Sequence, residues 1–173
     1  MKNLLSPSKL LSGVLCICVA LSSCKKGSDG VAAVPPAVTP TAAFTYKADG
    51  GATVTVDSAN AVLYNLMGSR EMDVYAFKGG LQVLEFHFAP TVGNKNANPA
   101  LGGASSAFLT YDTSSPLMSW DGQSGAMNLT TCDTVGNKII GDFNFVAKVY
   151  PYTGTATKTI SEGHMYVTRV TKL

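Results

Sequence analysis

The sequence has 173 residues, of which 46% are hydrophobic and 14% are charged. This length is ample for one hydrophobic core. The formal net charge of +2 includes Lys2 and Lys9, and removal of an N-terminal segment with both lysines leaves 11 of the 13 basic residues. These balance the 11 acidic residues. The balance excludes the basic footprint of a nucleic-acid-binding protein.

Residues 1–23 are typical of a signal peptide. Lys2 and Lys9 supply positive charge at the start, and an apolar run follows from Leu10 to Leu21. The run is shorter than the roughly 20 residues that a membrane-spanning helix needs. We therefore expect export and cleavage, with no permanent membrane helix.

The apolar run is followed directly by Leu21-Ser22-Ser23-Cys24, which resembles the lipobox of bacterial lipoproteins. In that family the cysteine thiol receives a diacylglycerol, and a peptidase then cuts just before the cysteine. The resemblance implies lipidation of Cys24 and attachment of the mature chain to a membrane. Two or more acyl chains give stable attachment, because each buried methylene contributes about 0.8 kcal/mol. The alternative interpretation is an ordinary secretory signal that happens to contain a cysteine.

Residues 24–43 are predicted to be the lipidated cysteine and a flexible tether. Pro35, Pro36 and Pro40 interrupt any regular element in this segment. We expect the tether to hold the following domain, residues 44–173, away from the membrane.

The cysteines predict no disulfide bond in the mature chain. Cys16 and Cys18 leave with the signal peptide and Cys24 carries lipid, so Cys132 is the remaining thiol. A buried, inert thiol is favoured over a nucleophile at Cys132, because free cysteine is among the most buried residue types.

Residues 44–173 are rich in Thr, Val, Tyr, Phe and Gly and alternate with a period of two, whereas helical periodicity is scarce. This pattern predicts an all-β domain, as a single antiparallel β-sandwich or a partly closed barrel. Groups that share one face of a predicted strand are Met72, Val74 and Ala76; Leu84, Phe86 and Phe88; and Ile139, Gly141, Phe143, Phe145 and Ala147. Further strands are predicted at 53–56, 107–111, 127–132 and 159–170.

Segments rich in glycine and polar residues predict the turns between these strands. They are residues 78–80, 121–125 and 134–138. The pentapeptide Thr-Val-Gly-Asn-Lys occurs at 91–95 and again at 134–138, and we interpret both copies as turns. Residues 58–67 suit either a strand or a short helix, and a strand is favoured.

Three segments of the C-terminal half carry a family resemblance. Gly125–Asp133 is similar to a G-x-(I/L)-x-(I/L)-T-x-x-D hairpin, and Ile139–Ala147 to an I-x-G-x-F-x-F-x-A strand. Thr159–Met165 is similar to a closing T-I-x-x-G-x-F strand, with Met165 in place of the aromatic residue. These patterns resemble small Bacteroidota lipoproteins that have a β-sandwich domain and no known function. Their motif residues are core and turn positions, so the resemblance implies a fold and no chemistry.

The resemblance also implies a cellular location and a covalent modification. Surface-exported members often carry acidic residues after the lipidated cysteine, whereas this chain has Lys25-Lys26 there. That difference favours an outer-membrane anchor facing the periplasm. The group O-glycosylates tripeptides in which Asp is followed by Ser or Thr and then by a small or apolar residue. This pattern marks Ser58 and Thr134 as candidate acceptors.

The sequence predicts no catalytic residue, no metal site and no cofactor. Glu85 and His87 lie two apart on one strand face and would be able to share a metal ion, but no close pair such as H-x-x-x-H or C-x-x-C accompanies them. A solvated strand face is therefore the favoured interpretation. A metal-dependent or hydrolytic enzyme remains an alternative, with His87 and His164 in one deep pocket.

Aromatic residues suggest a second alternative, a glycan-binding module. Trp120 lies in a polar, glycine-rich stretch, and Tyr111 and Tyr152 are other aromatics expected at the surface. Aromatic faces stack on sugars through apolar and C–H contacts. The competing interpretation is that Trp120 packs against the neighbouring hairpin. The leading hypothesis is a non-enzymatic, membrane-anchored envelope lipoprotein that binds a protein partner or serves as an accessory subunit.

Overall fold

The computed structural model describes residues 42–66, 68–97 and 104–173. The predicted signal peptide, Cys24 and the tether up to residue 41 lie outside the described residues. The described residues form eleven strands, which confirms the expected all-β class, and contain no helix that is able to cross a bilayer. The strands are β1 (Thr45–Ala48), β2 (Val54–Thr55), β3 (Ser58–Leu66), β4 (Ser69–Lys78), β5 (Leu81–Phe88), β6 (Gly93–Ala97), β7 (Ser106–Ser114), β8 (Leu117–Asp133), β9 (Lys138–Lys148), β10 (Lys158–Val167) and β11 (Val170–Lys172).

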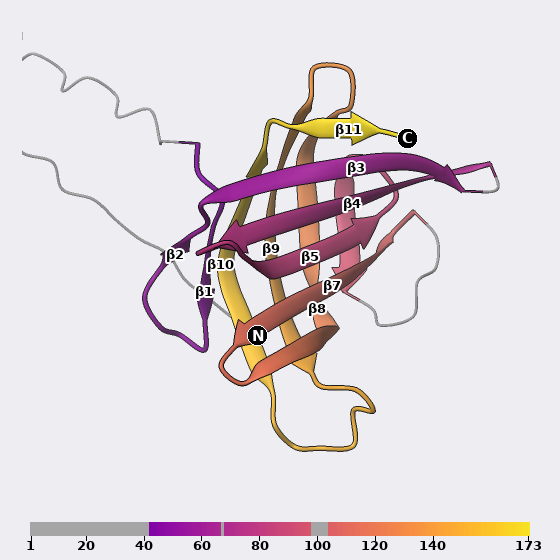
Figure 1. Ribbon diagram of the computed structural model, residues 1–173. Coiled ribbons are helices and arrows are strands. Elements are labelled where there is room, and N and C mark those ends of the chain that lie inside the picture. Colours follow the sequence, from indigo (N-terminus) through magenta and orange to yellow (C-terminus); the bar gives the residue numbers. More distant parts are fainter. Residues whose placement is uncertain (1–41, 67, 98–103) are drawn as a thin grey trace, which may run out of the picture. The chain divides into compact units, whose positions relative to one another are not determined.

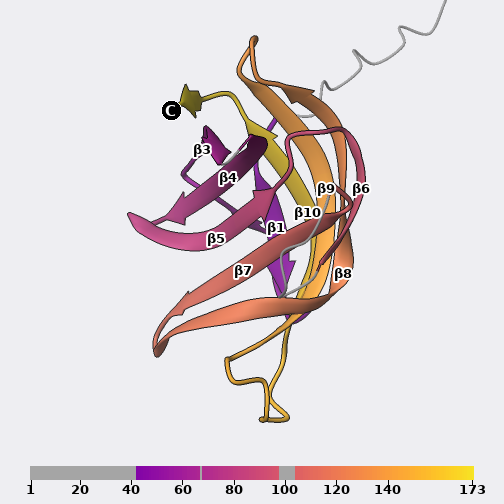
Figure 2. The same ribbon diagram turned by 90° about the vertical axis from the view of Figure 1, so that its right-hand side faces the viewer.

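All these strands belong to one sheet, in the order β11-β3-β4-β5-β7-β6-β8-β9-β10-β1-β2, with a further pairing of β7 with β8. The sheet is mixed, because β11 runs parallel to β3 and β6 parallel to β7. It curls so that β3, β4 and β5 lie opposite β9 and β10 (Figures 1 and 2). One mixed sheet curled into a half-barrel is thus found in place of the expected antiparallel sandwich, and it is nearer to the partly closed barrel.

Strand β8 makes much of this curl because it pairs with different neighbours along its length. Its segment 117–121 pairs with β7, and its segment 126–129 pairs with β6. The pairing of β8 with β9 shifts register near Gly122 and again near Leu129. Such β-bulges bend a strand and increase its twist, which lets one long strand serve both walls.

The prediction of a hairpin turn at residues 121–125 is wrong, because β8 runs through this segment without a break. Glycine and polar residues favour turns locally, but here the glycines permit close backbone approach. Gly125 has a φ of 125°, and a Cβ there would overlap the Asn144 backbone. A bent strand and a turn use the same residue types, so local pattern did not separate them.

The core lies between the two walls of the curled sheet. Phe86 of β5 packs edge-to-face on Phe143 of β9, with ring centroids 4.8 Å apart, and Phe44 contacts both rings. The strand faces predicted from the period-two pattern are buried, which confirms the inward direction of these groups. Their buried members are Met72, Val74, Ala76, Leu84, Phe86, Phe88, Ile139, Gly141, Phe143, Phe145 and Ala147.

Three further expectations are resolved by the structure. Residues 58–66 form β3, so the strand was the correct choice for this segment. Residues 91–95 were expected to be a turn, but Gly93–Ala97 form β6, whose Lys95 points inward. The closing strand ends at Val167, and β11 follows as a separate strand.

Candidate ligand-binding groove

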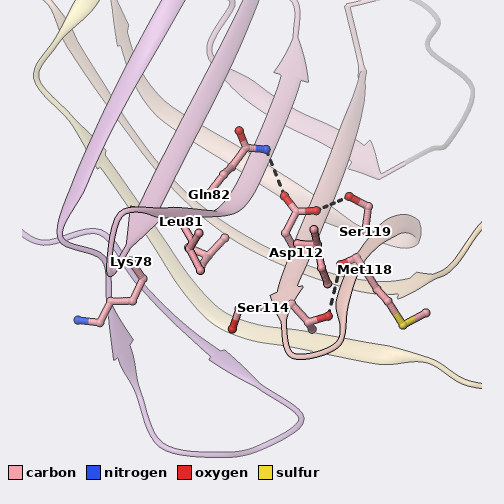
Figure 3. Close-up of a pocket in the computed structure, with 10 residues that line it drawn as sticks. Lys78, Leu81, Gln82, Asp112, Ser114, Met118 and Ser119 are labelled. Carbon is pink, nitrogen blue, oxygen red and sulfur yellow. Dashed lines mark hydrogen bonds between the residues drawn. The ribbon is translucent and has the colours of Figure 1, made fainter.

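A groove of about 520 Å³ lies between the β4–β5 turn and the β7–β8 hairpin (Figure 3). Lys78 and residues 81–83 line one side, and residues 112–114 and 117–119 line the other. The apolar lining residues are Leu81, Val83, Leu117 and Met118, and the polar ones are Lys78, Gln82, Asp112, Thr113, Ser114 and Ser119. The groove therefore combines an apolar rim with a hydrogen-bonding wall.

Tight turns hold both sides of the groove. Gly79 and Gly80 both have positive φ, of 60° and 78°, as a two-residue hairpin turn requires. The Asp57 carboxylate accepts hydrogen bonds from the Gly79 amide at 2.6 Å and from Lys78 Nζ at 2.8 Å. On the other side, Thr113 Oγ1 donates to the Pro116 carbonyl at 2.7 Å.

Asp112 is the centre of the polar wall (Figure 3). Its carboxylate accepts hydrogen bonds from the Ser119 hydroxyl, its cross-strand neighbour, and from Gln82 Nε2 at 3.1 Å. The same Gln82 nitrogen donates to Glu85 Oε2 at 3.0 Å. One amide thus connects two carboxylates from different strands, and the wall is fixed before any ligand arrives.

The wall has an excess of negative charge. Burial raises the pKa of Glu85 above its ordinary value, and the neighbouring Asp73 and Asp112 act in the same direction. Lys78, the cation in the lining, is already paired with Asp57. A ligand that brings a positive charge or hydrogen-bond donors would relieve this excess.

The rim presents exposed apolar side chains. Leu117 is 83% exposed and Leu81 is 53% exposed, on opposite sides of the groove. Covering apolar surface contributes about 25 cal/mol for each Å² removed from water. The rim therefore favours a ligand with an apolar group beside its polar one.

A second polar cluster lies next to this wall, on β3, β4 and β5. Its centre is Asp73, which is 8% exposed and contacts the Tyr64 hydroxyl and His87 Nδ1. Tyr75 donates to the same carboxylate at 3.0 Å, and His87 Nε2 lies 3.3 Å from Glu71. Burial, together with the hydrogen bond to the Asp73 carboxylate and its charge, raises the pKa of Tyr75 to about 12.

The cluster does not form a metal site in the described part of the chain, where no group of three or more His, Cys, Asp or Glu residues is placed to hold an ion. Glu85 and His87 share a strand face as expected, but Glu85 bonds to Gln82 whereas His87 contacts Asp73. His164 is paired with a different carboxylate, Asp142, at 2.8 Å. The two histidines are thus not brought into one pocket.

The three candidate aromatic residues are divided between two places. Tyr111 and Trp120 are cross-strand partners, and Trp120 is buried with 8% exposure, although the hairpin at residues 121–125 on which it was expected to pack is not formed. Among the described residues, nothing forms a hydrogen bond with the Trp120 Nε1. Tyr152 instead donates to Asp121 at 2.7 Å and packs on Tyr150 with centroids 5.5 Å apart. No shared stacking platform results from these three.

The candidate glycosylation acceptors lie in turns or at strand ends whose aspartates already have structural partners. Ser58 is exposed at the start of β3, and Thr134 Oγ1 accepts from Arg70 at 3.3 Å. Asp57 binds the β4–β5 turn, and Asp133 accepts from the amides of residues 135 and 136 at 2.9 and 2.7 Å. Turn formation thus accounts for both aspartates without modification.

Cys132 is half-buried, and burial raises the pKa of its thiol. The thiolate is the nucleophilic form, so this environment disfavours reactivity.

Sequence reasoning missed Gln82, Asp112 and Ser119. Little in the sequence indicates that these residues form a site, because each lies close to a turn and polar residues are common near turns. The β7–β8 hairpin places Ser119 opposite Asp112, and the pairing of β7 with β5 brings Asp112 to Gln82, which is 30 residues away in the sequence.

The fold and the groove define a class, a one-sheet β domain with a preformed, mildly acidic groove at a hairpin end. Comparison of the chain with protein families, curated proteins and solved structures finds no match.

Proposed function

We propose that this chain is a lipid-anchored envelope protein that binds a partner protein, without catalysis, through the groove between the β4–β5 turn and the β7–β8 hairpin. The observation that carries the proposal is the fixed Gln82–Asp112–Ser119 wall beside the exposed rim of Leu81 and Leu117. The sequence Leu21-Ser22-Ser23-Cys24 supports the anchor, and Lys25-Lys26 directly after it favour an outer-membrane lipid with the mature domain in the periplasm.

The lining favours one kind of segment on the partner. An apolar side chain would cover the exposed leucines, and an adjacent lysine or arginine would face Asp112. Charge-assisted hydrogen bonds to a carboxylate are stronger than neutral ones, and arginine forms them in pairs. We therefore propose a basic-apolar segment of a protein as the occupant.

Site-specific photocrosslinking in intact cells tests the groove. A photoreactive residue at position 117 should capture a partner, whereas one at position 135 should not. Leu117 is the first residue of β8, Val135 lies just beyond the other end of that strand, and both are 83% exposed, so position 135 is a matched control. The captured protein is identified by mass spectrometry, and its crosslinked segment is synthesised as a peptide.

Calorimetry with that peptide then tests the chemistry. Leu117→Asp and Asp112→Asn should each weaken binding about tenfold, which corresponds to about 1.4 kcal/mol, whereas Val135→Asp should leave it unchanged. Equal crosslinking from both positions, or a captured segment without a basic residue, would contradict the proposed site.

The anchor is tested separately. Cys24→Ser should move the protein from the membrane fraction to the soluble fraction, and mass spectrometry of the native protein should find lipid on residue 24. An unmodified N-terminus in the membrane fraction would contradict the anchor and leave the groove proposal intact.

A further inference from the structure

A second surface, on β6, β8, β9 and β10, carries an unusual set of asparagines. Asn94, Asn128 and Asn144 are exposed in the interiors of three neighbouring strands. Asparagine is depleted in strands, because its short amide competes for backbone hydrogen bonds and packs poorly. Three of them on one face of adjacent strands therefore call for a reason other than strand stability.

The register places these residues in rows across the strands. Asn94 is directly opposite Asn128, Asn128 is opposite Asp142, and Asp142 is opposite His164. Neighbouring strands lie about 4.8 Å apart, so this row of four side chains extends about 14 Å. Asn144 belongs to the next row, opposite Ala126.

The rows line a hollow of about 470 Å³, whose lining also includes the buried Phe143. Ala126 and Gly163 lie in this lining, and a Cβ on Gly163 would overlap the Phe143 ring. A second hollow of about 450 Å³ shares Asn144 and continues toward Ser124 and Thr159. The two together accommodate an elongated ligand.

The charged groups here are already paired, and the amides are free. Asp142 bonds to His164 at 2.8 Å, and Glu162 bonds to Lys47 at 2.7 Å. Within the described residues, the side-chain amides of Asn94, Asn128 and Asn144 have no hydrogen-bond partner. A ligand on this surface would therefore meet the three uncharged asparagine amides, each of which both donates and accepts hydrogen bonds.

We propose that this surface, the asparagine face, binds a neutral glycan chain laid across β6, β8, β9 and β10. Sugar hydroxyls also donate and accept together, so neighbouring hydroxyls match the oxygen and nitrogen of one amide. A phosphorylated or sulfated polymer would meet Asp142 and Glu162 and find no unpaired cation in this lining. A lipid surface would find no large exposed apolar side chain there.

Binding of defined oligosaccharides to the mature lipoprotein, in a detergent without sugar, tests the proposal. The probes are neutral hexamers of glucose, mannose and N-acetylglucosamine, and an anionic heparin hexasaccharide. Titration calorimetry should detect at least one neutral hexamer. The double variant Asn128→Ala/Asn144→Ala should weaken that binding at least about tenfold, because several hydrogen bonds are lost together.

Asn65→Ala is the matched control, because Asn65 is exposed on β3, away from this face. It should bind the hexamer as the parent does, and Asn128→Asp, which keeps the size but removes the donors, should bind it more weakly. The proposal is overturned if no neutral hexamer binds, if only the heparin fragment binds, or if the asparagine variants bind unchanged. Loss of binding in Leu117→Asp but not in the asparagine variants would also overturn it and assign the sugar to the hairpin groove.

Discussion

Asp73 and His87 are cross-strand partners on β4 and β5, and the His87 Nδ1 contacts a carboxylate that is 8% exposed. The other oxygen of the Asp73 carboxylate accepts hydrogen bonds from the hydroxyls of Tyr64 and Tyr75. A buried carboxylate is costly unless hydrogen bonds compensate for lost hydration. The two tyrosines and the histidine supply that compensation, so this polar cluster stabilises the outer face of β3, β4 and β5.

His87→Ala removes one of the three partners of Asp73 and should destabilise the protein by about 1–3 kcal/mol, because a buried acceptor loses its donor. Urea unfolding followed by circular dichroism measures the change. His164→Ala is the control: it also breaks a histidine–carboxylate pair, but the side chains are 42% and 68% exposed, so the expected change is within about 0.5 kcal/mol. Equal losses in the two variants would show that burial of Asp73 is not the deciding factor.

Glu85→Gln should make the protein more stable at pH 7. Burial raises the pKa of Glu85 in the folded state, so the native protein retains its proton to a higher pH than the unfolded chain does. The parent therefore loses stability as the pH rises from the unfolded pKa, about 4.3, through the folded pKa. The advantage of the variant should vanish below about pH 4, as thermal unfolding across pH will measure.

Asp57→Asn should show the opposite pH dependence. Hydrogen bonds from Lys78 and the Gly79 amide lower the pKa of Asp57, so its contribution to stability exists above the unfolded pKa and is lost as the pH falls through the folded pKa. The variant should be less stable than the parent at pH 7 and approach it in acid. Parallel pH profiles for the two proteins would contradict this assignment.

Gly163→Ala should destabilise the protein by about 1–3 kcal/mol, because the added methyl would overlap the Phe143 ring in a packed core. Gly154→Ala is the matched control, since nothing lies within 4 Å of the Cβ position of Gly154. Its expected change is within about 0.5 kcal/mol. Equilibrium denaturation of both variants checks the difference, and equal stabilities would exclude the steric explanation.

Trp120→Phe should change stability by less than about 1 kcal/mol, because the lost apolar contact is offset by removal of a buried N–H without a partner. Trp120→Ala should cost about 3–5 kcal/mol. Circular dichroism is the suitable probe, because Trp120 is the sole tryptophan and both substitutions remove its fluorescence. A large loss in the phenylalanine variant would contradict the expected offset between packing and the buried N–H.

Local pattern predicted the class of the fold and the burial of its strands. Leu84, Phe86 and Phe88 point inward as expected, because successive side chains of a strand point to opposite faces whatever its partners are. Local pattern failed at Gly125, where a strand uses glycine for close backbone approach, and at residues 91–95, where Gly93 to Lys95 belong to β6 and not to a turn.

The candidate sites depended on pairing that no local pattern contains. Glu85 and His87 were visible as a pair on one strand, but their partners Gln82 and Asp73 followed from turn geometry and the β4–β5 register. A shift of one residue in that register would turn every side chain to the other face.

The sequence by itself determined that the domain is all-β and which side chains of most strands enter the core. These properties are local, because they follow from period-two alternation. Only the tertiary structure decided that the strands form one curled sheet, that Gln82 reaches Asp112, and that three asparagines share a face. These are long-range properties, since hydrogen bonds between distant strands and the packing of Phe86 on Phe143 select a single register.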